Sequence, residues 1–220
     1  MASFFNLTLD TIAPSGLTLT INDGALYTTS ASVSLAIGIG DASTSGYQMK
    51  IWGINGVSAE GDADWETFAA TKTVALTAGD GLKTVYVKVR DDVGNETTVV
   101  SDTITLDTAV PVVSISGPDK SKISKVEGFN QAVFNFTADV DFEEYKVCVV
   151  PATNSTQEAG KIIGTANGSV NTSGSEGGYP ASTNIAVTIT GADLAAVSAD
   201  DGVKIIKVFV RNTAGTWSVA

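Results

Sequence analysis

The sequence contains an internal repeat, and this repeat constrains the fold more than any other feature of the chain. Residues 9–14 (LDTIAP) recur as residues 106–111 (LDTAVP), an offset of 97 residues. Residues 80–90 (DGLKTVYVKVR) recur as residues 201–211 (DGVKIIKVFVR), an offset of 121 residues. Because both copies hold the same parts in the same order, the chain is predicted to contain one module twice.

The two offsets differ by 24 residues, so the second copy must carry an insertion. Residues 151–182 are rich in Gly, Ser, Thr and Asn, which predicts a long loop with at most a short strand around 161–163. A loop of this length in a compact domain is either functional or disordered. Its candidate partner-contact residues are Lys161, Tyr179 and Pro180, and plain flexible decoration is the alternative.

Apolar residues alternate with small or polar residues in both copies, as at Val33, Leu35 and Ile37. This period of two predicts antiparallel strands with one buried face and one solvated face. Asp80-Gly81 and Asp201-Gly202 supply the positive φ of tight turns. The predicted strands span 17–21, 32–39, 47–53, 72–77, 83–90, 97–106, 112–116, 131–138, 145–150, 183–190, 203–211 and 216–220, with a helical turn at 191–197.

This number of short strands per ~100 residues predicts an all-β chain of two tandem immunoglobulin-like antiparallel β-sandwich domains. We expect an N-terminal arm or strand at residues 1–10, a first domain at 11–107 and a second domain at 108–220. The long loop belongs to the second domain.

Residues 80–95 (DGLKTVYVKVRDDVGN), followed by 106–111, resemble bacterial and phage immunoglobulin-like repeats. Those repeats carry a D-G-x-K-x-V-x-V-x-V-[RK]-D-x-x-G-N strand and turn and an L-D-T-x-x-P junction. The second copy departs from this pattern, because residues 212–216 (NTAGT) lack the Asp and the Asn of the turn. The resemblance implies display and attachment in phage tail, baseplate or capsid-decorating proteins or in bacterial surface adhesins, without a catalytic motif.

Histidine is absent and cysteine occurs once, at Cys148 in an apolar run. These counts exclude a Ser-His-Asp triad, a Cys-His pair and the usual zinc sites. A mechanism based on two carboxylates stays open chemically. We therefore expect a protein that is not an enzyme, with Cys148 as a small buried residue.

The net charge is −11, of which residues 1–107 contribute −8 and residues 108–220 contribute −3. An acidic surface repels nucleic acid and anionic membranes. No segment approaches the ~20 apolar residues of a membrane span, and residues 1–6 lack the features of a signal peptide. We expect no nucleic-acid binding, no membrane insertion and a location in the virion, with the extracellular or cell surface as the alternative.

Residues 2–9 align by the first offset with residues 99–106, the last predicted strand of domain 1. Domain 2 holds only a short stretch after its matching turn. A sandwich without one strand exposes unpaired backbone that an added strand satisfies. The hypothesis is an assembly arm, formed by Phe4, Phe5, Leu7 and Leu9, that completes domain 2 of a neighbouring subunit or docks another partner; the alternative is an arm that packs on its own domain 1 or frays.

Two further sets of residues are candidate binding sites. Asp62, Asp64, Asp91 and Asp92 place carboxylates on loops and could begin a Ca²⁺ site, although solvated acidic loops are the plainer interpretation. Trp52 and Trp65 are candidate contacts for a glycan, because aromatic faces stack on sugar rings. At least one aromatic residue of this region is expected in the core instead.

The sequence therefore predicts a non-enzymatic phage virion structural protein, either a capsid decoration protein or a tail or baseplate accessory. The alternatives are a fragment of a bacterial cell-surface adhesin and a carbohydrate-binding accessory module. The expected partners are further copies of the chain, other virion proteins, and a glycan or protein on a host surface. No cofactor is expected apart from the candidate calcium ion.

Overall fold

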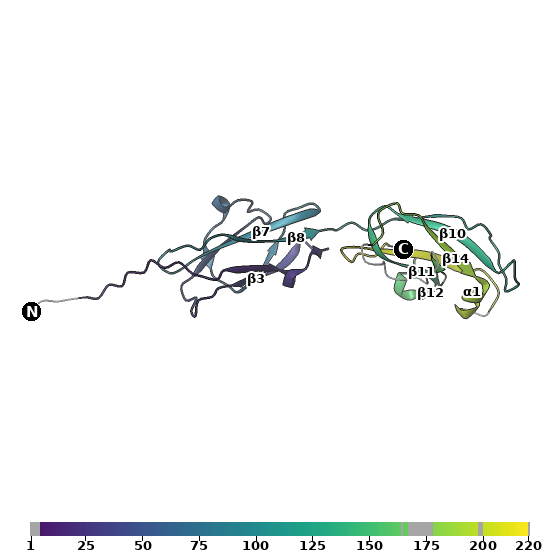
Figure 1. The fold of residues 1–220 in the computed structure, drawn as a ribbon, viewed down its shortest axis with the longest axis horizontal. Coiled ribbons are helices and arrows are strands. Elements are labelled where there is room, and N and C mark those ends of the chain that lie inside the picture. Colours follow the sequence, from purple (N-terminus) through teal and green to yellow (C-terminus); the bar gives the residue numbers. More distant parts are fainter. Residues whose placement is uncertain (1–4, 164, 167–177, 198–199, 220) are drawn as a thin grey trace, which may run out of the picture. The chain divides into compact units, whose positions relative to one another are not determined.

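The computed structural model describes residues 5–163, 165–166, 178–197 and 200–219. The chain divides into two compact units, Met1–Thr108 and Ala109–Ala220, here called domain 1 and domain 2 (Figure 1). The described residues form short strands, three short 3-10 helices and a single α-helix. Among these described helices, none combines the length and the apolar character that crossing a lipid bilayer requires.

Domain 1 is built from two antiparallel sheets whose inner faces enclose an aliphatic core. One sheet has the order β1-β3-β6 and the other has the order β2-β8-β7-β4-β5. Strand β2 pairs with β8 in parallel, and all other pairs are antiparallel. The strands are β1 (Thr18–Ile21), β2 (Tyr27–Thr28), β3 (Ser32–Gly38), β4 (Gln48–Trp52), β5 (Glu66–Thr67), β6 (Thr71–Ala75), β7 (Gly81–Arg90) and β8 (Val100–Leu106), with 3-10 helices η1 (Asn22–Gly24) and η2 (Glu60–Asp62).

Domain 2 repeats this arrangement with fewer strands in its second sheet. One sheet has the order β13-β14-β10-β9 and the other has the order β12-β11-β15. The strands are β9 (Val113–Ser116), β10 (Gln131–Ala138), β11 (Phe142–Val150), β12 (Lys161–Ile162), β13 (Thr165–Ala166), β14 (Ile185–Thr190) and β15 (Ile205–Asn212), with the 3-10 helix η3 (Gln157–Ala159) and the helix α1 (Gly191–Val197). Both domains therefore have the two-sheet architecture of an immunoglobulin-like sandwich.

The registers of the strands establish that the two domains are copies of one blueprint. In domain 1, β4 pairs with β7 and places Gln48 opposite Arg90. In domain 2, β11 pairs with β15 and places Glu144 opposite Arg211. Strand β15 thus repeats β7 at the offset of 121 residues that the sequence predicts, and the predicted duplication is confirmed.

Alternation of side chains explains why these segments form half-buried strands. In β3, Val33, Leu35 and Ile37 are buried while the serines between them are exposed. In β7, Val85, Val87 and Val89 are completely buried. Successive side chains of a strand point to opposite faces, so each strand delivers one apolar row to the core.

The two cores are filled by different side chains. The buried residues in the core of domain 1 are aliphatic apart from Met49, and the half-buried Tyr47 and Phe68 pack against them. The core of domain 2 contains an aromatic cluster of Phe136, Phe142, Tyr145 and the half-buried Tyr179, with ring centroids 4.8 to 6.4 Å apart. The same arrangement of strands therefore holds two different cores. What a core requires is apolar side chains of the right total volume, more than particular residue types.

The predicted elements differ from the observed strands in two respects. The predicted strand at 216–220 is wrong for residues 216–219, which contain a single isolated bridge between Trp217 and Arg211. The two-residue strands β2, β5 and β13 carry too few residues to show a period and were not predicted. The predicted helical turn at 191–197 and the short strand near residue 161 are confirmed as α1 and β12.

Candidate functional site

The turn that follows β7 is closed by the carboxylate of Asp91. Its Oδ1 accepts the backbone N–H groups of Val93 (3.0 Å) and Asn95 (2.8 Å). The side-chain amide of Asn95 donates to Asp91 Oδ2 at 2.7 Å and to the carbonyl oxygen of Asp10 at 3.4 Å. Gly94 completes the turn at φ +93°, a conformation that glycine adopts without strain. Side-chain hydrogen bonds to the local backbone therefore hold the turn.

The pKa of Asp91 is lowered in this environment. Burial of the carboxyl group acts to raise the pKa, but the hydrogen bonds from Asn95, Val93 and Gly94 favour the charged form and outweigh burial. At neutral pH the group is an ionised carboxylate whose oxygens are occupied by the turn. Asp91 is therefore a structural residue.

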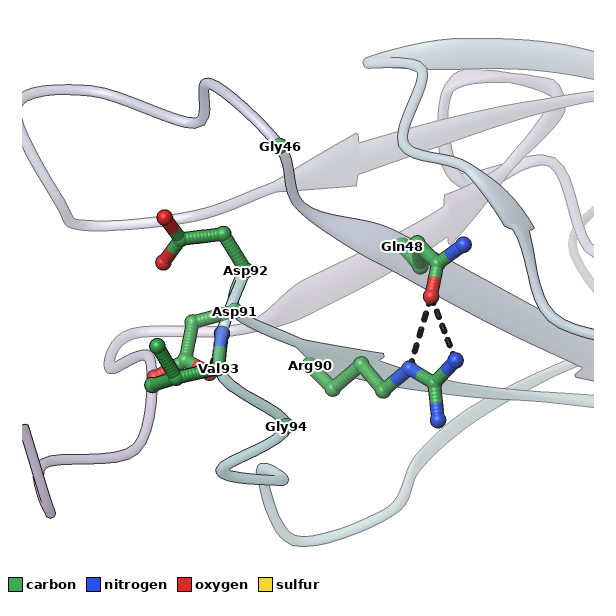
Figure 2. Close-up of a pocket in the computed structure, with 7 residues that line it drawn as sticks. All are labelled: Gly46, Gln48, Arg90, Asp91, Asp92, Val93 and Gly94. Atoms are coloured by element: carbon green, nitrogen blue, oxygen red, sulfur yellow. Dashed lines mark hydrogen bonds between the residues drawn. The ribbon is translucent and has the colours of Figure 1, made fainter.

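The turn and the end of β4 line an open hollow of about 400 Å³, which Figure 2 shows. Arg90 is the basic residue among those that line the hollow, and its Nε donates to the side-chain oxygen of Gln48 at 2.8 Å. The Trp65 ring lies against Arg90, with its centroid 4.2 Å from the guanidinium carbon. Among the described residues, no carboxylate forms an ion pair with Arg90. The hollow thus holds a cation whose partners are a neutral amide and an aromatic face.

One side of the hollow is closed by a tight backbone approach. Gly46 has φ +81°, and a Cβ atom at this position would lie 2.7 Å from the Cβ of Asp92. Only glycine fits here without a shift of the neighbouring turn. Figure 2 shows the Asp92 carboxylate pointing away from the Arg90 guanidinium, so the two charges do not form a joint site.

The outer face of the β4–β7 pair continues with charged residues. Lys50 and Lys88 lie opposite each other in the register. Lys88 Nζ lies 2.5 Å from Glu96 and 3.1 Å from Glu60, and these hydrogen bonds raise the pKa of Lys88. Lys50 Nζ lies 5.2 Å from the centroid of the Trp65 ring. Carboxylates and an aromatic face thus offset the repulsion between the two lysines.

Trp52 is not a surface contact for a sugar. Its side chain lies on the outer face of the sheet, but only 7% of the residue is exposed, and its ring stacks on Tyr86 with centroids 5.5 Å apart and planes 8° apart. The expectation that Trp52 contacts a glycan is therefore corrected: the neighbouring strand covers the ring. Trp65 is half-buried between its two cations and retains a partly exposed surface.

The four candidate calcium ligands are not brought together as one set. Asp62 accepts hydrogen bonds from the Ser58 hydroxyl (3.3 Å) and the Ala59 N–H (3.2 Å), which cap η2. Asp91 is occupied by its turn, and Asp64 and Asp92 are exposed. Within the described ranges, no group of three or more Asp, Glu, His or Cys side chains is placed to hold a metal ion.

Domain 2 builds the same turn from different residues. Asn212 Oδ1 accepts the N–H of Thr216 at 2.8 Å, and Gly215 has φ +91°. The Asn212 side-chain amide donates to the carbonyl oxygen of Ala109 at 3.1 Å. An asparagine therefore replaces both the aspartate and the asparagine of the first copy, and the departure of 212–216 from the family pattern does not change the turn.

The arginine of the second copy has a different set of partners. A β-bulge between Phe142 and Glu144 sets two residues of β11 against one residue of β15. As a result Glu143 and Glu144 both reach the Arg211 guanidinium, at 3.0 and 2.9 Å. The Trp217 ring centroid lies 5.9 Å from the same group.

The candidate contact residues of the loop have separate positions. Tyr179 stacks on Phe142 with centroids 4.8 Å apart and exchanges two backbone hydrogen bonds with it, so it belongs to the core. Lys161 is exposed and donates to the carbonyl oxygen of Val197 at 3.3 Å, and Pro180 is exposed. Residues 164 and 167–177 of the predicted loop lie outside the described residues.

The apolar side chains in the described part of the N-terminal arm, residues 5–9, do not pack on domain 1. Phe5, Leu7 and Leu9 are 85 to 87% exposed, and Figure 1 shows the first described residues leaving domain 1 as an extended trace. Phe4 lies outside the described residues.

Cys148 is completely buried, and burial raises the pKa of its thiol, which disfavours the reactive thiolate.

Sequence reasoning missed Arg90 and Gln48 as the polar centre of the hollow. The repeat contained a usable signal, because Arg90 and Arg211 occupy matching positions while the residues opposite them are Gln48 and Glu144. The pairing of these residues depends on strand register, which the sequence pattern alone left open.

No family model matches the chain, and no curated protein matches its sequence. Similar solved structures include the fibronectin(III)-like modules of CbhA from Clostridium thermocellum, with 13% identity over 92% of this chain and 90% of that chain and a TM-score of 0.43. The chitinase ChiA74 from Bacillus thuringiensis has 13% identity over 92% of this chain and 30% of that chain, with a TM-score of 0.33. Dimeric latent PorU from Porphyromonas gingivalis has 14% identity over 97% of this chain and 20% of that chain, with a TM-score of 0.29.

The chain spans less than a third of the length of the chitinase and PorU structures. At such identities and scores these likenesses say nothing about function. The assignment of two tandem immunoglobulin-like sandwich domains is carried by the strand order and the registers.

Proposed function

We propose that this chain is a non-catalytic structural module, in which two immunoglobulin-like domains in series space and present a surface within a larger assembly. The proposed setting is the phage virion, with the bacterial cell surface as the alternative. The partners proposed with it are further copies of the chain or other proteins of the same assembly, and a glycan or protein on a host surface.

The observation that carries this proposal is a hydrogen bond repeated in both domains. In domain 1 the Asn95 amide donates to the backbone of Asp10, and in domain 2 the Asn212 amide donates to the backbone of Ala109. Each bond ties the first segment of a domain to the turn that follows the matching strand, β7 in domain 1 and β15 in domain 2. A domain whose first segment is hydrogen-bonded to its own body can be linked end to end with further domains.

The chemistry of the hollow supports the same proposal. Asp91 is occupied by backbone donors, and Arg90 is held by Gln48 and Trp65. The residues that line the hollow do not pair a nucleophile with a base, which hydrolytic mechanisms require.

Carbohydrate binding is the second candidate, favoured by the half-buried ring of Trp65 beside the polar groups of the hollow. A glycan array and pull-down on insoluble polysaccharides test both roles with the full chain. The spacer role predicts no binding and no release of reducing sugar. Binding that Trp65→Ala abolishes, and that Trp217→Ala leaves intact, would replace the spacer role with sugar recognition.

A mechanical measurement tests the spacer role directly. Pulling the chain from its two ends in optical tweezers should give two separate unfolding events, one for each domain, because each domain has its own core. A single event that unfolds both domains together would contradict a role as two serial modules.

A further inference from the structure

Domain 1 gathers two cations around one tryptophan ring on the outer face of the β4–β7 pair. The centroid of the Trp65 ring lies 4.2 Å from the guanidinium carbon of Arg90 and 5.2 Å from Nζ of Lys50. All three side chains are half-buried, so each keeps an exposed part. Of the carboxylates in the described part of the chain, none forms an ion pair with either cation. These three residues are here called the cation cluster of domain 1.

Domain 2 builds a similar cluster and neutralises it with its own carboxylates. The centroid of the Trp217 ring lies 4.4 Å from Nζ of Lys146 and 5.9 Å from the guanidinium carbon of Arg211. Glu143 and Glu144 lie 3.0 and 2.9 Å from Nη2 of Arg211, and Glu144 lies 3.8 Å from Nζ of Lys146. Both cations of this cluster therefore have a carboxylate partner.

The strand registers make the two clusters equivalent. Gln48 lies opposite Arg90 as Glu144 lies opposite Arg211, and in both strands a lysine follows two positions later. The tryptophans, by contrast, come from a segment before β5 in domain 1 and from a segment after β15 in domain 2. The two domains thus form the same grouping with tryptophans at unrelated positions, which duplication of the module alone does not explain.

Gln48 takes the place of Glu144 without supplying its charge. Nε and Nη2 of Arg90 both donate to the side-chain oxygen of Gln48, as Nε and Nη2 of Arg211 both contact Oε2 of Glu144. Figure 2 shows the third guanidinium nitrogen of Arg90, Nη1, directed away from Gln48. No described residue accepts a hydrogen bond from this nitrogen. The amide therefore orients the guanidinium and leaves its charge and one donor nitrogen available to a ligand.

The described part of domain 1 has no counterpart of Glu143. That glutamate reaches its arginine because of the β-bulge in β11, whereas β4 pairs with β7 in an unbroken register. Tyr47, which precedes Gln48, donates its hydroxyl to Asp41 at 3.0 Å and packs against the core. A second acceptor for Arg90 is therefore not supplied by the adjoining residues of β4.

The hollow beside Arg90 gives a ligand access to the guanidinium. It measures about 400 Å³, which is enough for a side chain of another molecule. The oxygens of Asp91 are bound by its own turn, and Figure 2 shows the Asp92 carboxylate pointing away from Arg90. The two neighbouring aspartates therefore do not occupy the place that a ligand carboxylate would take.

We propose that the cation cluster of domain 1 binds an acidic side chain of a partner protein. The ligand is a glutamate or aspartate on an extended segment, whose carboxylate contacts Arg90 in the place that Glu143 takes in domain 2. Lys50 supplies the second positive charge. A protein ligand is favoured over an acidic sugar because domain 2 holds carboxylates of a polypeptide strand in the same grouping. This contact goes beyond the spacer role and does not depend on it.

The first test is a titration of the isotope-labelled full chain with a blocked synthetic peptide of residues 142–146 (FEEYK), followed by nuclear magnetic resonance. We expect the side-chain N–H signals of Arg90 and Trp65 to shift, because these groups line the site. The shifts should decrease at 1 M NaCl, because salt screens the attraction between exposed charges. The matched control peptide has glutamine at both glutamate positions and should leave these signals in place.

The second test installs in domain 1 the carboxylate that domain 2 already has. Gln48→Glu should weaken binding of the peptide by at least about tenfold, because the new carboxylate neutralises Arg90 and repels the ligand. This variant is expected to fold, since Glu144 occupies the same position in domain 2. Arg90→Ala should weaken binding as well. Glu144→Gln, the reciprocal change in domain 2, is the matched control and should leave the response of the Arg90 signal unchanged.

Three results would overturn the proposal. They are unshifted Arg90 and Trp65 signals with the glutamate peptide, equal shifts with the glutamine peptide, and undiminished binding in Gln48→Glu. Glucuronate tests the other class of ligand, and a response to glucuronate without a response to the peptide would replace the protein partner with an acidic glycan. The spacer role is tested separately by the two unfolding events, so the two proposals can fail independently.

Discussion

Arg90 and Arg211 occupy the same position in the two domains but have different partners. Arg90 lies opposite the neutral Gln48, while the β-bulge of β11 brings Glu143 and Glu144 to Arg211. A tryptophan packs on each arginine, yet Trp65 precedes β5 and Trp217 follows β15. The repeated domain therefore places an arginine near the end of β7 and of β15. In each domain, different neighbouring residues bind that arginine. Domain 1 is left with a cation beside an open hollow, and domain 2 with an ion pair.

The largest effect that separates the domains is expected from their cores. Phe136→Ala removes a ring of the aromatic cluster and should destabilise domain 2 by about 3–5 kcal/mol, while Leu35→Ala should destabilise domain 1 by about 2–5 kcal/mol. Calorimetry should show two transitions, of which each variant lowers one. A shift of both transitions in either variant would contradict two separate cores.

High pH should act on domain 2 through Tyr145. Burial, followed by the nearby Tyr179, raises the pKa of Tyr145 to about 12, above the usual tyrosine value of about 10. A raised pKa favours the protonated form in the folded state, so this stability is complete below pH ~10 and is lost as the pH rises to ~12.

Urea unfolding between pH 9 and 12 measures this loss, which should reach about 2–3 kcal/mol in domain 2. Tyr145→Phe should remove that part of the pH dependence. If the urea midpoint of domain 2 falls equally with pH in Tyr145→Phe, groups other than Tyr145 cause the loss of stability at high pH.

The smallest effect is expected from exchanging the arginine partners. Gln48→Glu gives Arg90 a carboxylate and should stabilise domain 1 by about 0.2–1 kcal/mol, because the side chains are partly exposed. Glu144→Gln in domain 2 is the reciprocal change and should cost a similar amount, with Glu143 retained. Both shifts should shrink at 1 M NaCl. A destabilised Gln48→Glu variant would mean that the hollow does not accept a carboxylate opposite Arg90.

The strands with long alternating runs could be predicted from the sequence, because an apolar period of two is visible in β3, β7 and β10. The helical turn of α1 was also predictable. The site was predicted less well. Trp52 and Tyr179 were singled out as contacts but pack against neighbouring rings, since a sequence shows which residues are aromatic and not what covers them.

The repeat by itself determined that one β-sandwich blueprint occurs twice, because matched apolar periods and matched turns need no knowledge of long-range contacts. Only the tertiary structure decided which residue faces each arginine, since the β-bulge that adds Glu143 is a property of strand pairing. It also decided that the apolar residues of the arm are exposed while their counterparts in β8 are buried. Burial depends on whether a segment pairs within a sheet, and this pairing exists only once the sheets have formed.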